Sequence, residues 1–367
     1  MSGSKSSRLV MLIFDTRRSL TFSAGEEWAK ELAGGGYYFD KISKVAFDSQ
    51  DEIVRSIGDG VNNYENVLIL CPAQMEETLK SYISGLCGSQ FDSVGIMRSQ
   101  NVNAFMAFTD GVNRITAKDI ISVLNSEYGE SFARSYIRFV GAPYNLINEV
   151  MGQAKKLCDE NNSREILFNV AESYGDFRME IVYSDVTPKM LVDRIIALVV
   201  GKLGDYVYAL EDITLAAQLI RLLKLRRMKI GIAESFTGGG VGKRIVDIPG
   251  ASEVYYEGLN TYSNTAKMLR LGVKEMTLKQ CGAVSAEVAY QMAEGVLSTG
   301  NCEVSVSTTG IAGPASDNTS KPVGLAFIGV GVDGDIAVYK FNFTGDRKKV
   351  TETAINQALF LTYKRLK

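Results

Sequence analysis

The residue types that could carry chemistry in this chain gather around a serine. Residues 230–240 read Ile-Gly-Ile-Ala-Glu-Ser-Phe-Thr-Gly-Gly-Gly, a short apolar run that leads into a serine and a glycine-rich stretch. This pattern predicts a strand, a tight turn and then a helix. Such a turn would expose the Ser235 hydroxyl beside a helix N-terminus, where free backbone N–H groups favour a negatively charged ligand.

The absence of histidine limits how Ser235 could be activated. The chain has no histidine, so a Ser-His-Asp triad is excluded. A lysine, a tyrosine, a carboxylate or a metal ion would have to take the proton instead. The turn has neither Walker A nor G-x-S-x-G spacing, and a purely structural bend is the alternative interpretation.

A second segment offers candidates for that base. Residues 260–267 read Asn-Thr-Tyr-Ser-Asn-Thr-Ala-Lys. Ser263 or Asn264 is a good N-cap, which places Tyr262 just before a helix and Lys267 near its first turn. We expect both side chains to reach one point. The alternative is a solvent-facing lysine and a half-buried tyrosine.

A third segment predicts a loop that approaches a ligand with its backbone. Residues 308–314 read Thr-Thr-Gly-Ile-Ala-Gly-Pro, and residues 321–324 read Lys-Pro-Val-Gly. Glycines after a β-rich run permit close backbone approach, although a structural hairpin would use them too. Arg347, in Gly-Asp-Arg, is a candidate anion-binding residue or part of an exposed turn.

The elements that must position these residues indicate an α/β fold with several domains. We expect an N-terminal α/β layered domain over residues 1–130, a small α+β connector over 131–207 and a C-terminal α/β domain over 208–367. Apolar runs and helical patterns alternate in the first domain, which favours a largely parallel sheet. Residues 205–229 predict one amphipathic helix, and its apolar positions at 213–225 favour self-association into a homo-oligomer such as a dimer.

Composition narrows the class of protein. Of the 367 residues, 46% are hydrophobic and 22% are charged, with a formal net charge of −2. That balance is typical of globular chains and gives no overall field for nucleic acid, so no nucleic-acid partner is expected. The five cysteines are scattered, as in reduced cytosolic proteins. No run is long enough for a membrane span, so we expect a cytoplasmic protein.

Together, the motifs of the last domain resemble one family. Ala-Glu-Ser-x-Thr-Gly-Gly, Thr-Tyr-Ser-Asn-x-Ala-Lys, Gly-Ala-Val-Ser, Thr-Gly-Ile-Ala-Gly-Pro with Lys-Pro-Val-Gly, and Gly-Asp-Arg occur here in the order found in the CinA C-terminal domain. This is the nicotinamide mononucleotide (NMN) deamidase family. The resemblance runs from about residue 208 to the end of the chain.

The resemblance implies hydrolysis of NMN to nicotinate mononucleotide and ammonia, as in pyridine-nucleotide salvage, with no cofactor and no metal. It assigns the catalytic roles to Ser235, Tyr262 and Lys267. The residues expected to contact the substrate are Glu234, Thr237, Gly238, Gly239, Thr309, Gly310, Ile311, Ala312, Gly313 and Arg347. Which of them would hold the oxyanion and which the phosphate is open. A non-catalytic nucleotide- or partner-binding protein in a competence or DNA-damage response is the alternative.

Two stretches depart from the family pattern, and the N-terminal domain departs further. Phe236 stands where a cysteine is usual, and residues 315–320 lack the usual glycines. The N-terminal domain is similar to the molybdopterin-binding-like domain of CinA only in layout. Residues 70–77 lack the glycines and the acidic pair of relatives with pyrophosphatase activity. We therefore expect no nucleotide hydrolysis there, which disfavours an ADP-ribose pyrophosphatase, although Glu76 and Glu77 are a conceivable metal-binding pair.

Overall fold

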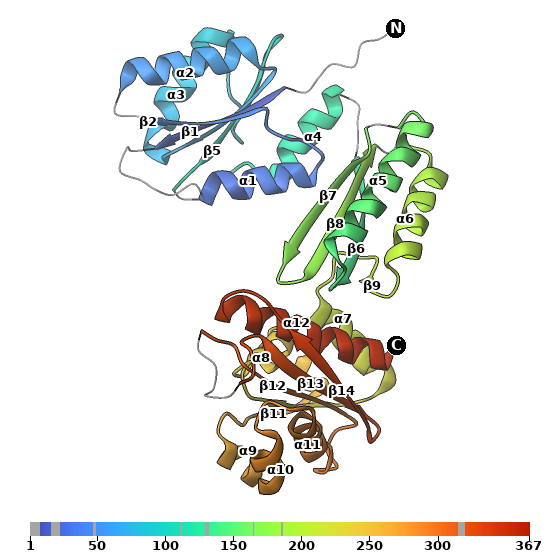
Figure 1. The fold of residues 1–367 in the computed structure, drawn as a ribbon. Helices are drawn as coiled ribbons and strands as arrows, with labels where there is room; N and C mark the ends of the chain where they lie inside the picture. Colours follow the sequence, from blue (N-terminus) through green and yellow to red (C-terminus); the bar gives the residue numbers. More distant parts are fainter. Residues whose placement is uncertain are drawn as a thin grey trace. The chain divides into compact units, whose positions relative to one another are not determined.

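Three β-sheets with helices against them organise the part of the chain that the computed structural model describes, residues 8–15, 23–46, 49–110, 112–128, 132–163, 165–184, 186–314 and 320–367 (Figure 1). These residues divide into two units. One comprises Met1–Ala133 with Val182–Val186, and the other comprises Arg134–Ile181 with Thr187–Lys367. Within the described ranges, no helix has both the length and the apolar character needed to cross a membrane. The α/β fold class expected from the sequence is confirmed.

The first unit contains a five-stranded sheet in the order β2-β1-β3-β5-β4. Its strands are β1 (Leu9–Asp15), β2 (Lys41–Ala46), β3 (Asn66–Cys71), β4 (Ile96–Arg98) and β5 (Asn103–Phe108). All pairs are parallel except β4 with β5, which confirms the expected largely parallel sheet. Its helices are α1 (Ser23–Gly34), α2 (Gln50–Asn63), α3 (Glu76–Cys87) and α4 (Ala117–Tyr128).

Alternation along β1 explains how this sheet carries helices on both faces. Leu9, Met11 and Ile13 pack in a core with residues of α1 and α4. Val10 and Leu12 pack in a second core with residues of α2 and α3. Successive side chains of a strand point to opposite faces, so a fully apolar strand such as β1 must be covered twice.

The connector region is a four-stranded sheet in the order β7-β8-β6-β9. Its elements are β6 (Phe132–Val140), α5 (Tyr144–Glu160), β7 (Leu167–Ser173), β8 (Asp176–Ser184), α6 (Lys189–Leu203) and β9 (Val207–Ala209). The sequence prediction of one helix over 205–229 was wrong in its first part, because β9 pairs there with β6. The buried Tyr208 hydroxyl accepts from Arg138 Nε at 2.8 Å and lies 3.0 Å from Asp176 Oδ1. These contacts stabilise a strand at Val207–Ala209, although local propensity favours a helix there.

The C-terminal region has a mixed sheet in the order β11-β10-β12-β13-β14. The strands are β10 (Ile230–Glu234), β11 (Tyr255–Asn260), β12 (Val304–Gly310), β13 (Leu325–Val332) and β14 (Asp335–Asn342). One face packs against α7 (Leu215–Arg226), α8 (Gly240–Val246) and α12 (Arg347–Leu366). The other packs against α9 (Asn264–Leu271), α10 (Glu275–Cys281) and α11 (Ala286–Leu297).

Strand register brings the three sequence motifs to one edge of this sheet. Strands β10, β11 and β12 are parallel, and Glu234 is paired with Asn260 on one side and with Thr308 on the other. Parallel strands that end in register release their following loops at the same edge. Ser235, Thr261 and the loop after Thr309 therefore meet although they lie far apart in the sequence.

Helix α12 connects the C-terminal region to the connector through hydrogen bonds. Asn356 Nδ2 donates to the carbonyl oxygens of Ser173 and Tyr174, at 3.1 and 3.0 Å. Arg244 of α8 donates to Asn356 Oδ1 at 3.0 Å and to Glu352 Oε2 at 2.5 Å. The helix that begins at Arg347 therefore also carries the contact with the β7–β8 turn.

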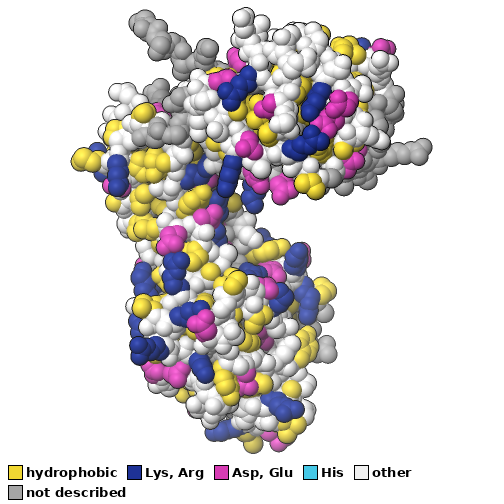
Figure 2. All heavy atoms as spheres, turned by 180° about the vertical axis from the view of Figure 1, so that it is seen from behind, with side chains coloured by type: hydrophobic (Ala, Val, Ile, Leu, Met, Phe, Trp, Pro, Cys, Tyr) yellow, Lys and Arg dark blue, Asp and Glu magenta, His cyan; other side chains and the backbone are white. Residues whose placement is uncertain are grey.

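Charged side chains of both signs are interspersed on the face drawn in Figure 2. The view shows lysine and arginine side chains next to aspartate and glutamate side chains on this face. Interspersed charges give a weaker field for a polyanion than a single basic patch would.

A glycine of α11 sets the distance to α9, and its replacement tests this packing. A Cβ on Gly295 would lie 2.2 Å from the carbonyl oxygen of Leu271, so Gly295→Ala should force α9 away and lower stability by about 1–3 kcal/mol. Gly201 of α6 has no atom within 4 Å of its added Cβ. Gly201→Ala should instead stabilise by about 0.5–1 kcal/mol. Thermal unfolding of both variants checks the opposite signs, and a Gly295→Ala midpoint equal to that of wild type would contradict the packing argument.

Candidate active site

Ser235 is the first residue after β10 and is held by backbone hydrogen bonds on both sides. Its N–H donates to the carbonyl oxygen of Thr308 at 3.0 Å, and its own carbonyl accepts from Gly238 N–H at 3.1 Å. The side chain is 8% exposed. The strand end and the turn therefore fix the hydroxyl in place, beneath the surface.

Lys267 brings its amine to the Ser235 hydroxyl. Lys267 is 1% exposed, and its Nζ lies 3.0 Å from Ser235 Oγ. The same nitrogen donates to the carbonyl oxygens of Thr261 at 2.8 Å and Tyr262 at 3.1 Å. Ser263, the N-cap of α9, accepts from Ala266 N–H and starts the helix that carries the lysine, which confirms Ser263 as one of the two expected caps.

Burial changes the proton affinity of this amine. Desolvation lowers the pKa of Lys267 from 10.5 to about 8, because an ammonium loses its hydration in the protein interior. A substantial neutral fraction therefore exists near pH 8. The alternative of a solvent-facing lysine does not describe this side chain.

The three contacts of Lys267 also fit the neutral amine. A neutral amine has two hydrogens and one lone pair, whereas carbonyl oxygens can only accept. The carbonyls of Thr261 and Tyr262 take up the two hydrogens. The lone pair is then left for the Ser235 hydroxyl hydrogen, which is the geometry of a general base beside a nucleophile.

Glu234 serves the turn itself. Its carboxylate accepts from Thr237 Oγ1 at 2.6 Å and from the backbone N–H groups of Gly239, Val241 and Gly242 at 2.9–3.0 Å. It is 2% exposed. Its oxygens already bind the first N–H groups of α8, so these groups are not free for an external anion as the sequence predicts, and the substrate contact expected of Glu234 stays a prediction.

A directional hydrogen-bond chain ends on the same carboxylate. Thr308 Oγ1 and Thr237 Oγ1 lie 2.7 Å apart. Because Thr237 donates its one hydroxyl hydrogen to Glu234, Thr308 must be the donor between the two threonines. The Thr237 hydroxyl is thus occupied within the turn. Sequence reasoning missed Thr308, whose signal was its place at the end of a buried strand next to β10.

The glycine turn leaves two backbone donors next to the serine. Gly238 N–H donates to Ser235 and Gly239 N–H donates to Glu234, so both N–H groups already have partners in the turn, and the substrate contacts expected of these glycines stay a prediction. Both glycines have positive φ, 63° and 95°, which favours glycine there. Among the described residues, the N–H groups of Phe236 and Thr237 have no hydrogen-bond partner.

The Tyr262 side chain lies away from the serine–lysine pair. It is 65% exposed, and its hydroxyl is 3.4 Å from Arg347 Nη2. Only its backbone carbonyl contacts Lys267. The expectation that the Tyr262 and Lys267 side chains meet is therefore corrected. The helix cap at Ser263 turns the chain so that the Tyr262 ring points outward while its carbonyl faces the amine.

Arg347 joins the Tyr262 ring to the third motif. Its Nη1 donates to the carbonyl oxygen of Gly313 at 2.8 Å, and Gly313 has φ +85°. Arg347 itself is exposed. A guanidinium at the N-terminus of α12, beside an exposed aromatic ring, can bind an anionic group.

The rest of the third motif packs against its neighbours. Thr309 Oγ1 donates to the carbonyl oxygen of Ala283 at 2.8 Å, so this buried hydroxyl supports the 282–285 loop. A Cβ on Gly310 would lie 3.0 Å from atoms of Phe236 and Ala326. Ile311 and Ala312 are each 5% exposed. Residues 315–319, where the loop departs from the family pattern, lie outside the described residues.

Lys321 and the carbonyl of Thr261 complete the supports that sequence reasoning did not assign. Lys321 Nζ donates to the carbonyl oxygens of Cys281 and Val284, both at 2.6 Å. Thr261 N–H donates to the Glu234 carbonyl at 2.8 Å. Backbone groups donate and accept whatever the side chain is, so no sequence signal could have identified Thr261.

Glu76, one of the two acidic residues after β3 in the first unit, has ordinary ion-pair partners. Glu76 Oε1 lies 2.6 Å from Lys80 Nζ and 3.5 Å from Arg114 Nη1. Among the described residues, no group of three His, Cys, Asp or Glu side chains could hold a metal ion. The position of Glu76 is explained by these ion pairs.

Comparisons with known proteins agree on the C-terminal region. The family model described as the CinA C-terminal domain matches residues 212–366. A competence-damage inducible protein of Caldicellulosiruptor saccharolyticus is 37% identical over 63% of this chain and 57% of its own length. A protein of the same description from Clostridium beijerinckii is 48% identical over 44% of this chain and 39% of its own length. The matched region therefore spans about half, or less, of these relatives.

Solved structures with related descriptions also match. The competence/damage inducible protein CihA from Agrobacterium tumefaciens is 34% identical, with a TM-score of 0.39, over 40% of this chain and 90% of that chain. A competence damage-inducible protein A from Klebsiella pneumoniae is 28% identical, with a TM-score of 0.41, over 41% of this chain and 94% of that chain.

Replacing Lys267 tests the effect of its burial. A pKa lowered from 10.5 to about 8 means that the folded chain binds fewer protons than the unfolded chain between these values, so stability rises as pH rises through that window. Below pH 8, burial of the protonated amine lowers the free energy of unfolding by about 3 kcal/mol. Lys267→Met should therefore be more stable than wild type at pH 7, and the difference should shrink towards pH 10.5. Lys274→Met, at an exposed position, is the control for denaturant unfolding across this range; a difference that does not change with pH would refute the shift.

Replacing Glu234 tests its role in the turn. Glu234→Gln keeps the shape but removes the charge and sets an NH₂ group against backbone donors. We expect a loss of about 2–4 kcal/mol in the free energy of unfolding. Glu294→Gln, at an exposed position of α11, is the matched control. Equal denaturant midpoints for the two variants would show that the carboxylate contacts contribute little.

Proposed function

Starting from the membership of residues 212–366 in the CinA C-terminal domain family, we propose that this domain is an amidohydrolase that converts NMN and water into nicotinate mononucleotide and ammonia. The observation that supports this most is the buried Ser235–Lys267 pair, with Oγ and Nζ 3.0 Å apart. An amide is a poor electrophile, so its hydrolysis needs an activated nucleophile, a base and donors for the developing oxyanion. The described site offers candidates for all three.

In the first half-reaction, Lys267 takes the hydroxyl proton as Ser235 Oγ bonds to the carboxamide carbon. The resulting ammonium then gives a proton to the carboxamide nitrogen. The carbon–nitrogen bond breaks, ammonia leaves and the nicotinoyl group remains as an ester on Ser235. The carbonyls of Thr261 and Tyr262 accept from Lys267, so they stabilise the positive charge it carries between the two transfers.

In the second half-reaction, water replaces the serine. Lys267 takes a proton from water as the water oxygen bonds to the ester carbon. It then returns a proton to Ser235 Oγ as that bond breaks. Nicotinate mononucleotide leaves and the pair is restored. No histidine is needed, because one buried lysine both accepts and donates the proton.

Two backbone groups are the proposed donors for the oxyanion. The N–H groups of Phe236 and Thr237 directly follow the nucleophile and, among the described residues, have no partner. Donors at this position stabilise the charge that develops on the substrate oxygen. Because these donors belong to the main chain, a phenylalanine at 236 is compatible with the chemistry.

We propose that the substrate phosphate and ring lie at the exposed side of the pair. Arg347 supplies a guanidinium for the phosphate. The exposed Tyr262 ring supplies a stacking surface for the pyridine ring, in place of the catalytic role that the resemblance implies. The backbone of the Gly310–Gly313 segment would approach the ribose. These assignments remain part of the proposal, as do a homo-oligomeric assembly, a cytoplasmic location and domain boundaries near residues 131 and 208.

Ammonia release from NMN tests the proposal on the full chain. Ser235→Ala and Lys267→Ala should each lower kcat by about a thousandfold or more, whereas Ser298→Ala, at an exposed position, should leave it unchanged. For wild type, kcat/KM should rise with pH through an apparent pKa near 8, because only the neutral amine accepts the proton. Calorimetry shows whether each protein binds NMN. Tight binding without ammonia would identify a nucleotide-binding protein, and full activity in Ser235→Ala would exclude the serine mechanism.

A further inference from the structure

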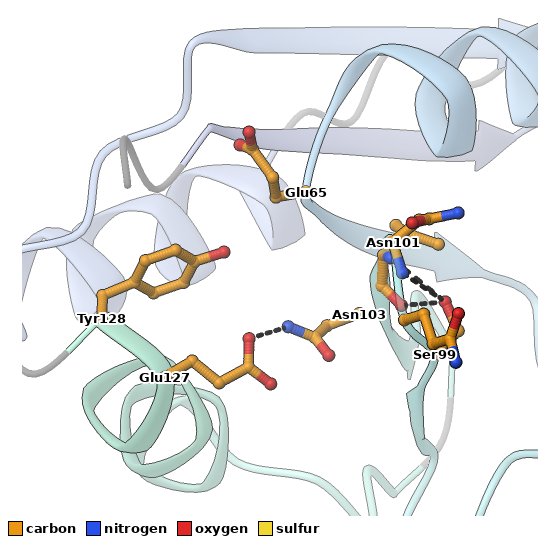
Figure 3. A pocket seen from close by; sticks show the side chains of 8 residues that line it. Glu65, Ser99, Asn101, Asn103, Glu127 and Tyr128 are labelled. Carbon is orange, nitrogen blue, oxygen red and sulfur yellow. Dashed lines mark hydrogen bonds between the residues drawn. The ribbon is translucent and has the colours of Figure 1, made fainter. Parts of the chain in front are cut away.

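The first unit contains a polar cavity that the proposed amidase chemistry does not use (Figure 3). Its volume is about 330 Å³, and its lining residues are Glu65, Ser99, Gln100, Asn101, Val102, Asn103, Glu127 and Tyr128. It lies at the amino ends of β3 and β5, where Asn66 and Asn103 begin their strands. This is the edge opposite to the carboxyl ends, where open parallel sheets usually bind ligands. A cavity of this size is within the range of small-molecule sites.

Of two buried asparagines in a hydrogen-bond network here, Asn103 lines the cavity and Asn66 lies behind it. Asn66 is fully buried and Asn103 is 3% exposed. Asn103 Nδ2 donates to Glu127 Oε2 at 2.6 Å and to Asn66 Oδ1 at 3.0 Å. Asn66 Nδ2 donates in turn to the Tyr128 hydroxyl at 2.8 Å. The carboxylate can only accept, so it fixes the orientation of both amides.

This orientation determines which polar atoms of the network remain free to bind a ligand. Both hydrogens of Asn103 Nδ2 are used. Among the described residues, the side-chain oxygen Oδ1 of Asn103 has no hydrogen-bond partner. The Tyr128 hydroxyl accepts from Asn66 and keeps its own hydrogen to donate. Glu127 retains its second oxygen. Figure 3 shows Glu127 and Asn103 facing each other, with the Tyr128 ring on the same side as Glu127.

The charge of the lining is negative. Glu65 and Glu127 are its ionisable acids, and the eight lining residues include no lysine or arginine. Glu65 accepts from the backbone N–H of Arg8 at 3.0 Å, and the Arg8 guanidinium lies over the Tyr64 ring. The pKa of Tyr128 is raised, first by desolvation and further by Glu127 and Glu65, which agrees with a negative field. An anionic ligand is disfavoured here.

A metal ion is also a poor fit to these groups. Two carboxylates with amide oxygens could approach a cation, but one oxygen of each carboxylate already accepts a hydrogen bond within the protein. The remaining groups are several acceptors and one hydroxyl donor around a volume larger than a single ion needs. A ligand with positive charge and several N–H donors matches them better.

We propose that this cavity binds a small organic cation of the ammonium or guanidinium class. The ligand would donate to the free side-chain oxygens of Glu65, Glu127 and Asn103. The amides of Gln100 and Asn101 lie at the same cavity and add polar partners of either kind. The proposal concerns the first unit alone and does not depend on the amidase activity.

Calorimetric titration of the full chain with agmatine, which carries a guanidinium and an ammonium, tests this site. We expect saturable binding of one molecule per chain that weakens as NaCl rises. Glu65→Gln and Glu127→Gln should each weaken binding roughly tenfold. Glu52→Gln, at an exposed position of α2, should leave it unchanged.

Neutral and anionic probes of similar length complete the test. 1,4-Butanediol and succinate should bind at least tenfold more weakly than agmatine if charge selects the ligand. Thermal unfolding of each variant shows whether it remains folded during the titration. No saturable binding of agmatine would overturn the proposal. Equal binding of the three probes, or undiminished binding in both cavity variants, would also overturn it.

Discussion

The carboxylate of Glu234 is the interaction on which the arrangement of the C-terminal region depends. It accepts four hydrogen bonds from the turn and from the first residues of α8, so the strand end, the glycines and the helix become one rigid piece. Backbone donors at a helix start need acceptors, and a buried carboxylate meets both the donors and the helix dipole. Ser235 is the next residue, so the contacts of the Glu234 carboxylate also fix the position of Ser235.

The second constraint is the cost of burying an amine. Lys267 comes from the loop and helix that follow β11, the strand next to β10, so strand register decides which residues can meet Ser235. Two main-chain carbonyls compensate part of the lost hydration of Lys267. The part of the lost hydration that these carbonyls do not compensate lowers the pKa of Lys267. In the proposed reaction, the same penalty makes the lysine useful, since a fully hydrated lysine would hold its proton too tightly near neutral pH.

Much of this arrangement could be predicted from residue patterns, and the remainder shows where patterns fail. The strand before Ser235, the cap at Ser263 and the loop after Thr309 follow from local propensity and turn chemistry. The partners of Glu234 do not, because a carboxylate that faces an external ligand and one that faces its own backbone have the same sequence. The outward Tyr262 ring depends on the exact path of the chain into α9. At Val207–Ala209 a strand replaces the first part of the expected helix. It depends on tertiary contacts of Tyr208 with Arg138, which outweigh the helical periodicity of the sequence.

The buried amine of Lys267 also has a consequence for covalent labelling. Acylating reagents attack neutral amines and spare ammonium ions, so at mildly alkaline pH this lysine is intrinsically more reactive than lysines on the surface. Its 1% exposure withholds that reactivity from bulky reagents. Only an electrophile small enough to reach the serine would meet it, so size rather than intrinsic reactivity would decide which reagents mark this residue.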